Sequence, residues 1–311
     1  MLLAAPLVIA MAEETAQDHA ERGRQAIARG EVSAAEAEIR EAVRLAPLDA
    51  EYLALLGVVL GMQHKLQESD AYLEKALRLD PADSATRRNL GWNQFQLGQL
   101  APAKTNLERV VKQQPGNAQA VLVLGMVEEE LKDYRGAVRL LESVPDQVRQ
   151  QPESMAALAR AYYYLGRSEK ARQTLKELQL HPQGPEGIFL GGQVAAEVRD
   201  FETAQSLFAS IRSTHPDSTK LGYNLALAQY HAREFPQGAE TLRGVIEGGH
   251  ESSEIYNLLA WCLYKQDDFK GAAAALDKAI ALDPAEESNY LDGGMMLLEL
   301  IPSLPTIGGS V

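Results

Sequence analysis

Cysteine is almost missing from this sequence, because Cys262 is the only one among 311 residues. A single cysteine cannot form an intrachain disulfide or build a Cys-rich zinc or iron–sulfur site. Aromatic residues make up only 6% of the chain and include two tryptophans, so the places where they gather are informative. A content of 46% hydrophobic and 23% charged residues is typical of a globular chain that buries a core.

Basic charge is also in short supply. Lysine and arginine number 30 against 43 aspartate and glutamate, which gives a formal net charge of −13. Such a chain repels phosphate backbones and anionic lipid surfaces. The charge therefore predicts no nucleic-acid partner.

Hydrophobic runs as long as a membrane span are absent, and the apolar run at the start of the sequence covers residues 1–12, MLLAAPLVIAMA. This run is too short to span a bilayer, which takes about 20 apolar residues, so no stable membrane insertion is expected. It matches the apolar part of a secretory signal with Ala10-Met11-Ala12 as the cleavage site, although a basic segment before it is missing. We expect residues 1–12 to be a signal peptide of an exported, periplasmic protein, or else a disordered N-terminus of a cytoplasmic one. Residues 301–311, with a Gly-Gly pair and no helical period, predict a flexible tail.

Catalytic and nucleotide-binding motifs are missing as well. The sequence contains no G-x-x-x-x-G-K-[ST], no G-x-S-x-G and no S-x-x-K. Its six histidines include no H-x-x-x-H pair, which a helical metal site would favour. We therefore predict a protein that is not an enzyme, with no catalytic residues, no metal site and no cofactor.

Two features could suggest catalytic groups, but each has a simpler structural explanation. Cys262 lies in a predicted helix with no base visible beside it, so a packed thiol is expected rather than a nucleophile. The run Glu128-Glu129-Glu130 is explained best as a solvated helix face, because a carboxylate pair for catalysis would need a pocket.

A 34-residue repeat is present. Pro47, Pro81 and Pro115 are each 34 residues apart, and units starting near 16, 50, 84, 118, 152, 185, 219 and 253 align. The eighth position is small in every unit: Gly23, Gly57, Gly91, Gly125, Ala159, Gly192, Ala226 and Ala260. The twentieth is small too: Ala35, Ser69, Ala103, Ala137, Ala171, Ala204, Gly238 and Ala272. The twenty-fourth is large and apolar: Ile39, Leu73, Leu107, Leu141, Leu175, Phe208, Leu242 and Leu276.

This rule predicts two helices per unit in close contact. Small residues let the helices approach, and the large residue fills the space beside their contact. Asp133, Asp200 and Asp268 precede the second helix and are expected to cap it. Ser33 with Glu36 predicts a capping box.

Two places depart from the period. Pro145 falls four residues early and predicts a shortened second helix in the fourth unit. The segment HPQGPEG, residues 181–187, predicts a bend, and whether it is a hinge is left open.

The pattern resembles the tetratricopeptide repeat, a helix–turn–helix unit of 34 residues. The resemblance implies an all-α, right-handed superhelical solenoid of about eight repeats over residues 13–300. A terminal helix over 287–300 would cover the last exposed face. Met295, Met296, Leu297 and Leu298 make that helix apolar, so a homodimer through the C-terminal helix is one expectation.

In proteins similar to this one, set positions of the first helix of each unit face a concave groove. Carried over to this sequence, those positions give the candidate ligand-binding residues Arg88, Asn89, Trp92, Phe95, Arg160, Tyr163, Tyr164, Phe189, Tyr223, Asn224, Tyr230, His231, Asn257, Trp261, Tyr264 and Lys265. Aromatic anchors with polar neighbours are typical of binding hot spots. About half of the aromatics are expected to reach solvent, the others packing between helices.

The resemblance also limits the kind of ligand. Asn89 and Asn224 share one repeat position, as in tetratricopeptide proteins whose asparagines hold a peptide backbone. The carboxylate clamp of the co-chaperone subfamily needs lysine and asparagine at set positions of three adjacent units, but positions 5 and 9 of the first unit are Ala20 and Arg24. This disfavours a chaperone-tail binder.

The sequence thus predicts a non-catalytic scaffold that binds a peptide or protein segment in the groove. Two alternatives stay open. One is a non-catalytic repeat region of a larger enzyme such as a glycosyltransferase. The other is a periplasmic scaffold of envelope or polysaccharide-export machinery.

Overall fold

The computed structural model describes residues 14–180, 184–214 and 218–300. Within these ranges all regular secondary structure is helical, and the chain has the fold of an all-α repeat solenoid. It divides into two compact units, one ending at Gln147 and the other beginning at Val148. No helix in the described ranges combines the length and the apolar character that crossing a bilayer requires.

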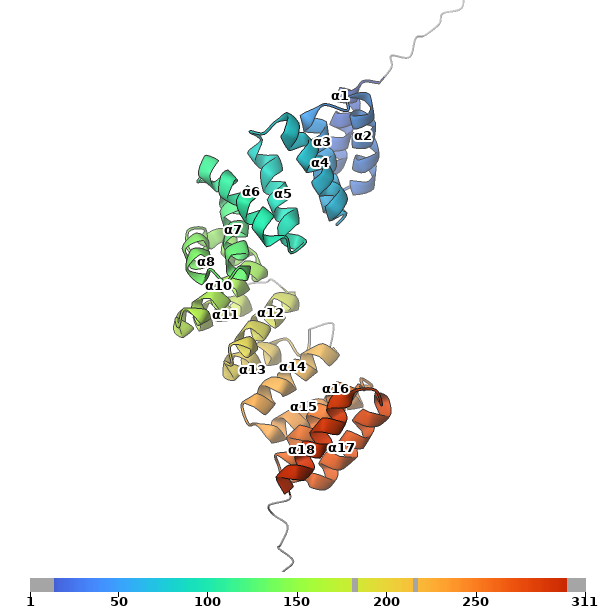
Figure 1. Ribbon diagram of the computed structural model, residues 1–311, viewed down its shortest axis with the longest axis vertical. Coiled ribbons are helices and arrows are strands. Elements are labelled where there is room, and N and C mark those ends of the chain that lie inside the picture. The colour runs from blue at the N-terminus through green and yellow to red at the C-terminus, as the bar shows by residue number, and fades with distance from the viewer. Residues whose placement is uncertain (1–13, 181–183, 215–217, 301–311) are drawn as a thin grey trace, which may run out of the picture. The chain divides into compact units, whose positions relative to one another are not determined.

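The first unit is a stack of four helix pairs, coloured blue to green in Figure 1. Its helices are α1 (Ala16–Ala28), α2 (Val32–Leu45), α3 (Ala50–Met62), α4 (Leu66–Leu79), α5 (Ser84–Gln96), α6 (Leu100–Gln113), α7 (Ala118–Glu130) and α8 (Tyr134–Leu141). Each helix packs mainly against its neighbours in the chain. The short α9 (Pro145–Gln150) lies across the boundary between the units.

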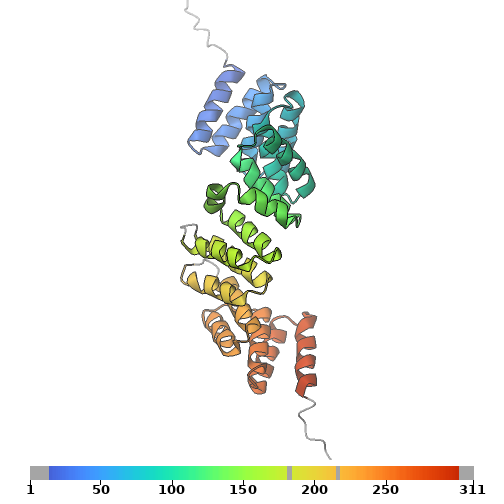
Figure 2. The same cartoon turned by 90° about the vertical axis from the view of Figure 1, so that its left-hand side faces the viewer.

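The second unit continues the same plan, yellow-green to red in Figure 2. Its helices are α10 (Pro152–Tyr164), α11 (Ser168–Leu180), α12 (Gly184–Glu197), α13 (Phe201–Ser210), α14 (Ser218–His231), α15 (Phe235–Glu247), α16 (Ser253–Tyr264), α17 (Phe269–Leu282) and α18 (Glu287–Leu300). The last helix, α18, packs against the α16–α17 pair.

The small–small–large rule is confirmed in atomic detail. A Cβ placed on Gly57 would lie 2.6 Å from Leu73 Cδ2, and one on Gly91 would lie 2.8 Å from Leu107 Cγ. Real side chains do not approach so closely, so at these two crossings the missing side chain leaves the space that the leucine fills. The large residues at these two crossings, Leu73 and Leu107, are fully buried.

The helix ends follow the predicted signals with one exception. Asp133, Asp200 and Asp268 each accept a hydrogen bond from the backbone N–H three residues on, which confirms them as N-caps of α8, α13 and α17. The prediction of a capping box formed by Ser33 and Glu36 is wrong. Helix α2 begins at Val32 with Glu31 as its N-cap and no side-chain cap, so Ser33 already lies inside the helix. The Glu36 carboxylate bonds to the side chains of Arg40 and Lys65.

Pro145 shortens the fourth pair as predicted. Helix α8 spans only Tyr134–Leu141, and α9 starts at Pro145 itself. The predictions for residues 1–12 and 301–311 lie outside the described residues, as do positions 181–183 of the expected bend.

Cys262 is a packed thiol, as expected. It is buried in a cluster with Ala226, Leu242 and Leu259, and burial raises the pKa of its thiol to about 12. At neutral pH the sulfur is therefore protonated and weakly nucleophilic.

The reading of Glu128, Glu129 and Glu130 as a solvated face is wrong for two of the three. Glu128 and Glu129 are buried and only Glu130 is exposed. The Lys104 ammonium of α6 donates to Glu128 Oε2 at 3.0 Å, which compensates the buried charge. The Lys104–Glu128 pair thus joins α6 to α7, which belong to neighbouring repeats.

Candidate functional site

Helix α5 presents the candidate residues of the first unit. Trp92 is 36% exposed, and the Phe95 ring lies beside it with 5.9 Å between ring centroids. Asn89 is partly exposed, and its Oδ1 accepts a hydrogen bond from Arg88 Nη2 at 3.4 Å. The four predicted residues thus lie together on one helix surface, with an indole at its centre.

A cavity of about 220 Å³ opens beside Trp92, between α3, α4 and α5. Every lining residue is uncharged: Gly57, Val58, Gly61, Met62, Ser69, Leu73, Asn89, Trp92 and Asn93. Sequence reasoning found Asn89 and Trp92 here but missed the residues of α3 and α4, which come from the preceding repeat.

A buried hydrogen-bond chain forms the floor of this cavity. The Ser69 hydroxyl donates to the Gly57 carbonyl at 2.6 Å, and Asn93 Nδ2 donates to Ser69 Oγ at 2.7 Å. Ser69 is fully buried and Asn93 is 4% exposed. Next to them, burial raises the pKa of the Asp70 carboxyl although a hydrogen bond from Asn93 opposes this. The second repeat thus carries polar groups where most repeats have alanine at the twentieth position.

A second cavity of about 350 Å³ lies between α3 and α5 and shares Val58 and Asn89 with the first. Three carboxylates line it: Glu51, Asp80 and Asp83. Asp83 is already engaged as the N-cap of α5. The first unit therefore places an acidic hollow next to an uncharged one.

The predicted residues of α10 are used inside the second unit. Arg160 Nε and the Tyr164 hydroxyl both donate to Glu197, each at 3.0 Å. The Tyr163 hydroxyl donates to Asp200 Oδ2 at 2.9 Å, and burial together with this carboxylate raises the pKa of Tyr163. These contacts join α10 to the next repeat. Of the two tyrosines, Tyr164 is the more accessible and is half exposed.

Phe189, expected on the groove surface, is buried instead. It is 6% exposed and packs against Phe208 with 5.4 Å between ring centroids. On α14, Tyr223 and Tyr230 are partly buried, and burial raises the pKa of Tyr223.

A cavity of about 320 Å³ lies between α12 and α14. Asn224 and His231 line it together with Glu197. The Asn224 amide donates to the Lys220 carbonyl of its own helix at 2.8 Å, and His231 stacks on Phe201. The asparagine amide is therefore partly used by the helix that carries it.

Helix α16 gives a mixed result. Trp261 is partly exposed and Lys265 is exposed, with the Lys265 ammonium 5.5 Å from the indole centroid. Tyr264, expected in the groove, is buried at 7% exposure against Phe269. The Asn257 amide donates to Asn289 and Asp292 of α18. Trp261 and Lys265 remain as surface groups.

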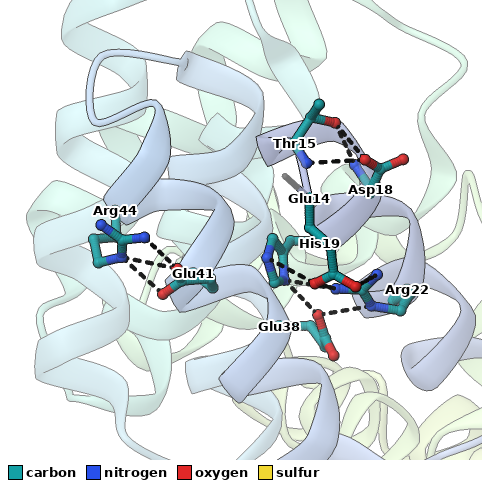
Figure 3. Close-up of polar contacts among 8 residues, drawn as sticks. All are labelled: Glu14, Thr15, Asp18, His19, Arg22, Glu38, Glu41 and Arg44. Atoms are coloured by element: carbon teal, nitrogen blue, oxygen red, sulfur yellow. Dashed lines mark hydrogen bonds and ion pairs between the residues drawn. The ribbon is translucent and has the colours of Figure 1, made fainter. Parts of the chain in front are cut away.

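A charged cluster on α1 and α2 was not predicted (Figure 3). Thr15 and Asp18 form a capping box at the start of α1. His19 Nδ1 lies 2.7 Å and Arg22 Nε 3.0 Å from Glu38 Oε2. The drawing also includes Glu14, which binds Arg22, and the Glu41–Arg44 pair. Glu38 lies on α2 while His19 and Arg22 lie on α1, so local spacing could not reveal these contacts, which join the two helices.

Two family models, both described as tetratricopeptide repeat, match the chain. One matches residues 62–127 and 130–187, and the other matches residues 20–84 and 223–287. The chain belongs to the tetratricopeptide repeat family.

Individual relatives are distant. The BBSome complex member BBS4 homolog of Drosophila melanogaster is 21% identical over 192 residues, which cover 50% of this chain and 40% of that protein. The chain thus matches less than half the length of that curated relative. One fold can serve many functions, so this match assigns no partner to the chain.

Solved structures give the same result. Pseudomonas aeruginosa PilF superposes with a TM-score of 0.52 at 22% identity, covering 66% of this chain and 94% of PilF. PilW, a type IV pilus biogenesis factor, superposes with a TM-score of 0.56 at 17% identity, covering 68% and 98%. Because the sequence identities are this low, the two superpositions show a shared fold and no more.

Proposed function

We propose that this chain is a non-catalytic scaffold that binds a peptide or protein segment along the face formed by the first helices of its repeats. The observation that carries the proposal is Trp92, exposed at the mouth of an uncharged cavity. Tetratricopeptide repeat proteins are generally scaffolds without catalytic activity, which supports the same reading.

The physical argument concerns surface area and hydration. An exposed indole beside a hollow offers a partner much apolar area with few torsions to fix. Trp261 beside Lys265 offers a similar contact on the second unit. Phe189 and Tyr264 are buried. We place the binding contacts at side chains of the first helices that are at least partly exposed: Asn89, Trp92, Phe95, Tyr164, Trp261 and Lys265.

Affinity capture from native extract tests the proposal. A Trp92→Ala, Trp261→Ala variant should lose the partners that the intact chain retains, because losing buried aromatic anchors costs about 2 kcal/mol or more of binding free energy. Leu48→Ala with Leu282→Ala is the matched control, since these side chains are exposed outside the proposed face. Equal capture by the tryptophan variant, at equal helicity by circular dichroism, would contradict the proposal.

We also propose that the chain is exported. The apolar run 1–12 with Ala10-Met11-Ala12 supports this, and a similar fold in a type IV pilus biogenesis factor is compatible with it. Mass spectrometry of the mature chain should find Glu13 at the N-terminus, and Met1 on the functional protein would contradict export.

A further inference from the structure

The cavity beside Trp92 has apolar walls and a polar floor. Val58, Met62, Leu73 and Trp92 form the walls. Its volume of about 220 Å³ exceeds the roughly 150 Å³ of an engineered cavity that binds benzene. It is smaller than the roughly 300–1,000 Å³ of small-molecule sites. The space therefore suits one ring-sized side chain.

The floor has a definite hydrogen-bonding character. Because the Ser69 hydrogen is directed at the Gly57 carbonyl, Ser69 Oγ must accept from Asn93, which fixes Nδ2 as the atom facing Ser69. A Cβ placed on Gly61 would lie 3.4 Å from Asn93 Oδ1, so this oxygen borders the space beside Gly61. No donor to Asn93 Oδ1 is found among the described residues. Asn93 Oδ1 is thus a hydrogen-bond acceptor at the floor of the cavity.

Gly61 creates the space. At the same repeat position, the twelfth, the other units carry Ile27, Phe95, Glu129, Tyr163, Ala196, Tyr230 and Tyr264. Three of these are tyrosines, whose rings lie against the neighbouring helices of the second unit. In α3 the chain supplies no side chain at this position, and the space that a tyrosine takes elsewhere is left open.

We propose that this cavity is the anchor pocket for a tyrosine side chain of the partner segment, with its hydroxyl donating to Asn93 Oδ1. This inference rests on the proposed function and adds the chemistry of the ligand. The ring would lie between the Trp92 indole and the Met62 thioether, both of which attract aromatic faces or edges. A charged side chain would lose its hydration without a charged partner in the lining.

A tyrosine is distinguished from phenylalanine by the floor. A phenylalanine ring would cover Asn93 Oδ1 and leave a buried acceptor without a donor, whereas tyrosine supplies the donor. The expected difference in affinity is about fivefold to tenfold, the usual effect of one such hydrogen bond.

Selection from a random heptapeptide library displayed on phage, with the full chain immobilised, tests the inference. We expect enriched peptides to share a tyrosine, and their tyrosine-to-phenylalanine versions to bind about fivefold to tenfold more weakly by fluorescence polarisation. Gly61→Tyr, which fills the pocket from within, should weaken binding more than tenfold. Gly116→Tyr is the matched control and should bind as the intact chain does, because Gly116 has open space around it. If Gly61→Tyr loses helicity, Gly61→Ala narrows the pocket in its place.

The outcomes separate the two proposals. Tyrosine peptides bound equally by the intact chain and Gly61→Tyr overturn the pocket and leave the scaffold function standing. Peptides that bind equally well when phenylalanine replaces their tyrosine overturn the role of Asn93 as acceptor of the tyrosine hydroxyl. A library with no enriched peptide contradicts both the pocket and the proposed function.

Discussion

At the residue scale, two glycines of one helix serve different purposes. Gly57 lies where α3 crosses α4, and a Cβ there would meet Leu73 at 2.6 Å. Gly61, one turn later, has room for a Cβ, whose nearest neighbour would be 3.4 Å away. The first glycine is required by packing, and the second leaves a surface space.

Alanine substitution separates the two glycines. Gly57→Ala should lower the free energy of unfolding by about 1–3 kcal/mol through overpacking. Gly61→Ala should raise it by up to about 1 kcal/mol, because alanine favours the helix. Urea unfolding followed by circular dichroism measures both, and equal effects of the two substitutions would contradict the assignment.

Glu36 gives a prediction for pH. Hydrogen bonds from Lys65 and Arg40 lower the pKa of Glu36 to about 2, from 4.5. A lowered pKa in the folded state contributes stability above pH 4.5 that is lost as the pH falls towards 2. Lys65 and Arg40 are largely solvated, so Glu36→Gln should cost only about 1 kcal/mol at pH 7.

Thermal unfolding at pH 7 and near pH 2 checks this. The difference between Glu36→Gln and the intact chain should shrink at the lower pH. A difference of the same size at both pH values would show that the charge of Glu36 does not contribute to stability.

The sequence could predict residues whose role is set within one repeat. Gly57 and Leu73 occupy the eighth and twenty-fourth positions of one unit, which are 16 residues apart in every unit, so their contact follows from the period. The Ser33–Glu36 capping box failed because α2 begins at Val32, before Ser33, and the Glu36 carboxylate pairs with Lys65 of the next helix pair. A partner 29 positions away has no local signature.

At the scale of elements, the caps of the second helices are not equivalent. Asp268 is exposed, and among the described residues its side chain accepts only from the backbone at the start of α17. Asp200 also accepts from Arg172 Nε at 2.7 Å and from the Tyr163 hydroxyl. Burial raises the pKa of Asp200, but these hydrogen bonds outweigh it and the net pKa is lowered.

Removing the two carboxylates should therefore have unequal effects. Asp268→Ala should cost about 1 kcal/mol, the value of one cap. Asp200→Ala should cost more, about 2–3 kcal/mol, because Arg172 and Tyr163 also lose their acceptor. Chemical unfolding of both variants gives the comparison, and equal losses would reduce Asp200 to a cap.

The elements themselves followed from the sequence more fully than the surface did. Period, prolines and small residues predict paired helices, and Pro145 correctly predicts a short α8. Which side chains reach solvent depends on contacts outside the repeat pattern. Phe208 covers Phe189, Phe269 covers Tyr264, and Lys104 pairs with the buried Glu128.

At the scale of the whole molecule, the apolar face expected on the last helix is smaller than the sequence suggested. Tyr290, Leu291 and Met295 of α18 are exposed, but Met296 is buried. The side chains of Leu297 and Leu298 lie outside the described residues. A homodimer through α18 stays a proposal, and sedimentation of Leu291→Glu against the intact chain tests it.

A partner bound at the proposed face covers Trp92. Trp261→Phe leaves Trp92 as the single tryptophan of the chain, so its fluorescence reports on this site alone. Titration of that variant with the selected tyrosine peptide should shift Trp92 emission to shorter wavelength and protect it from acrylamide quenching, because the indole becomes buried. Saturating peptide that leaves the emission and the quenching of Trp92 unchanged would contradict the account.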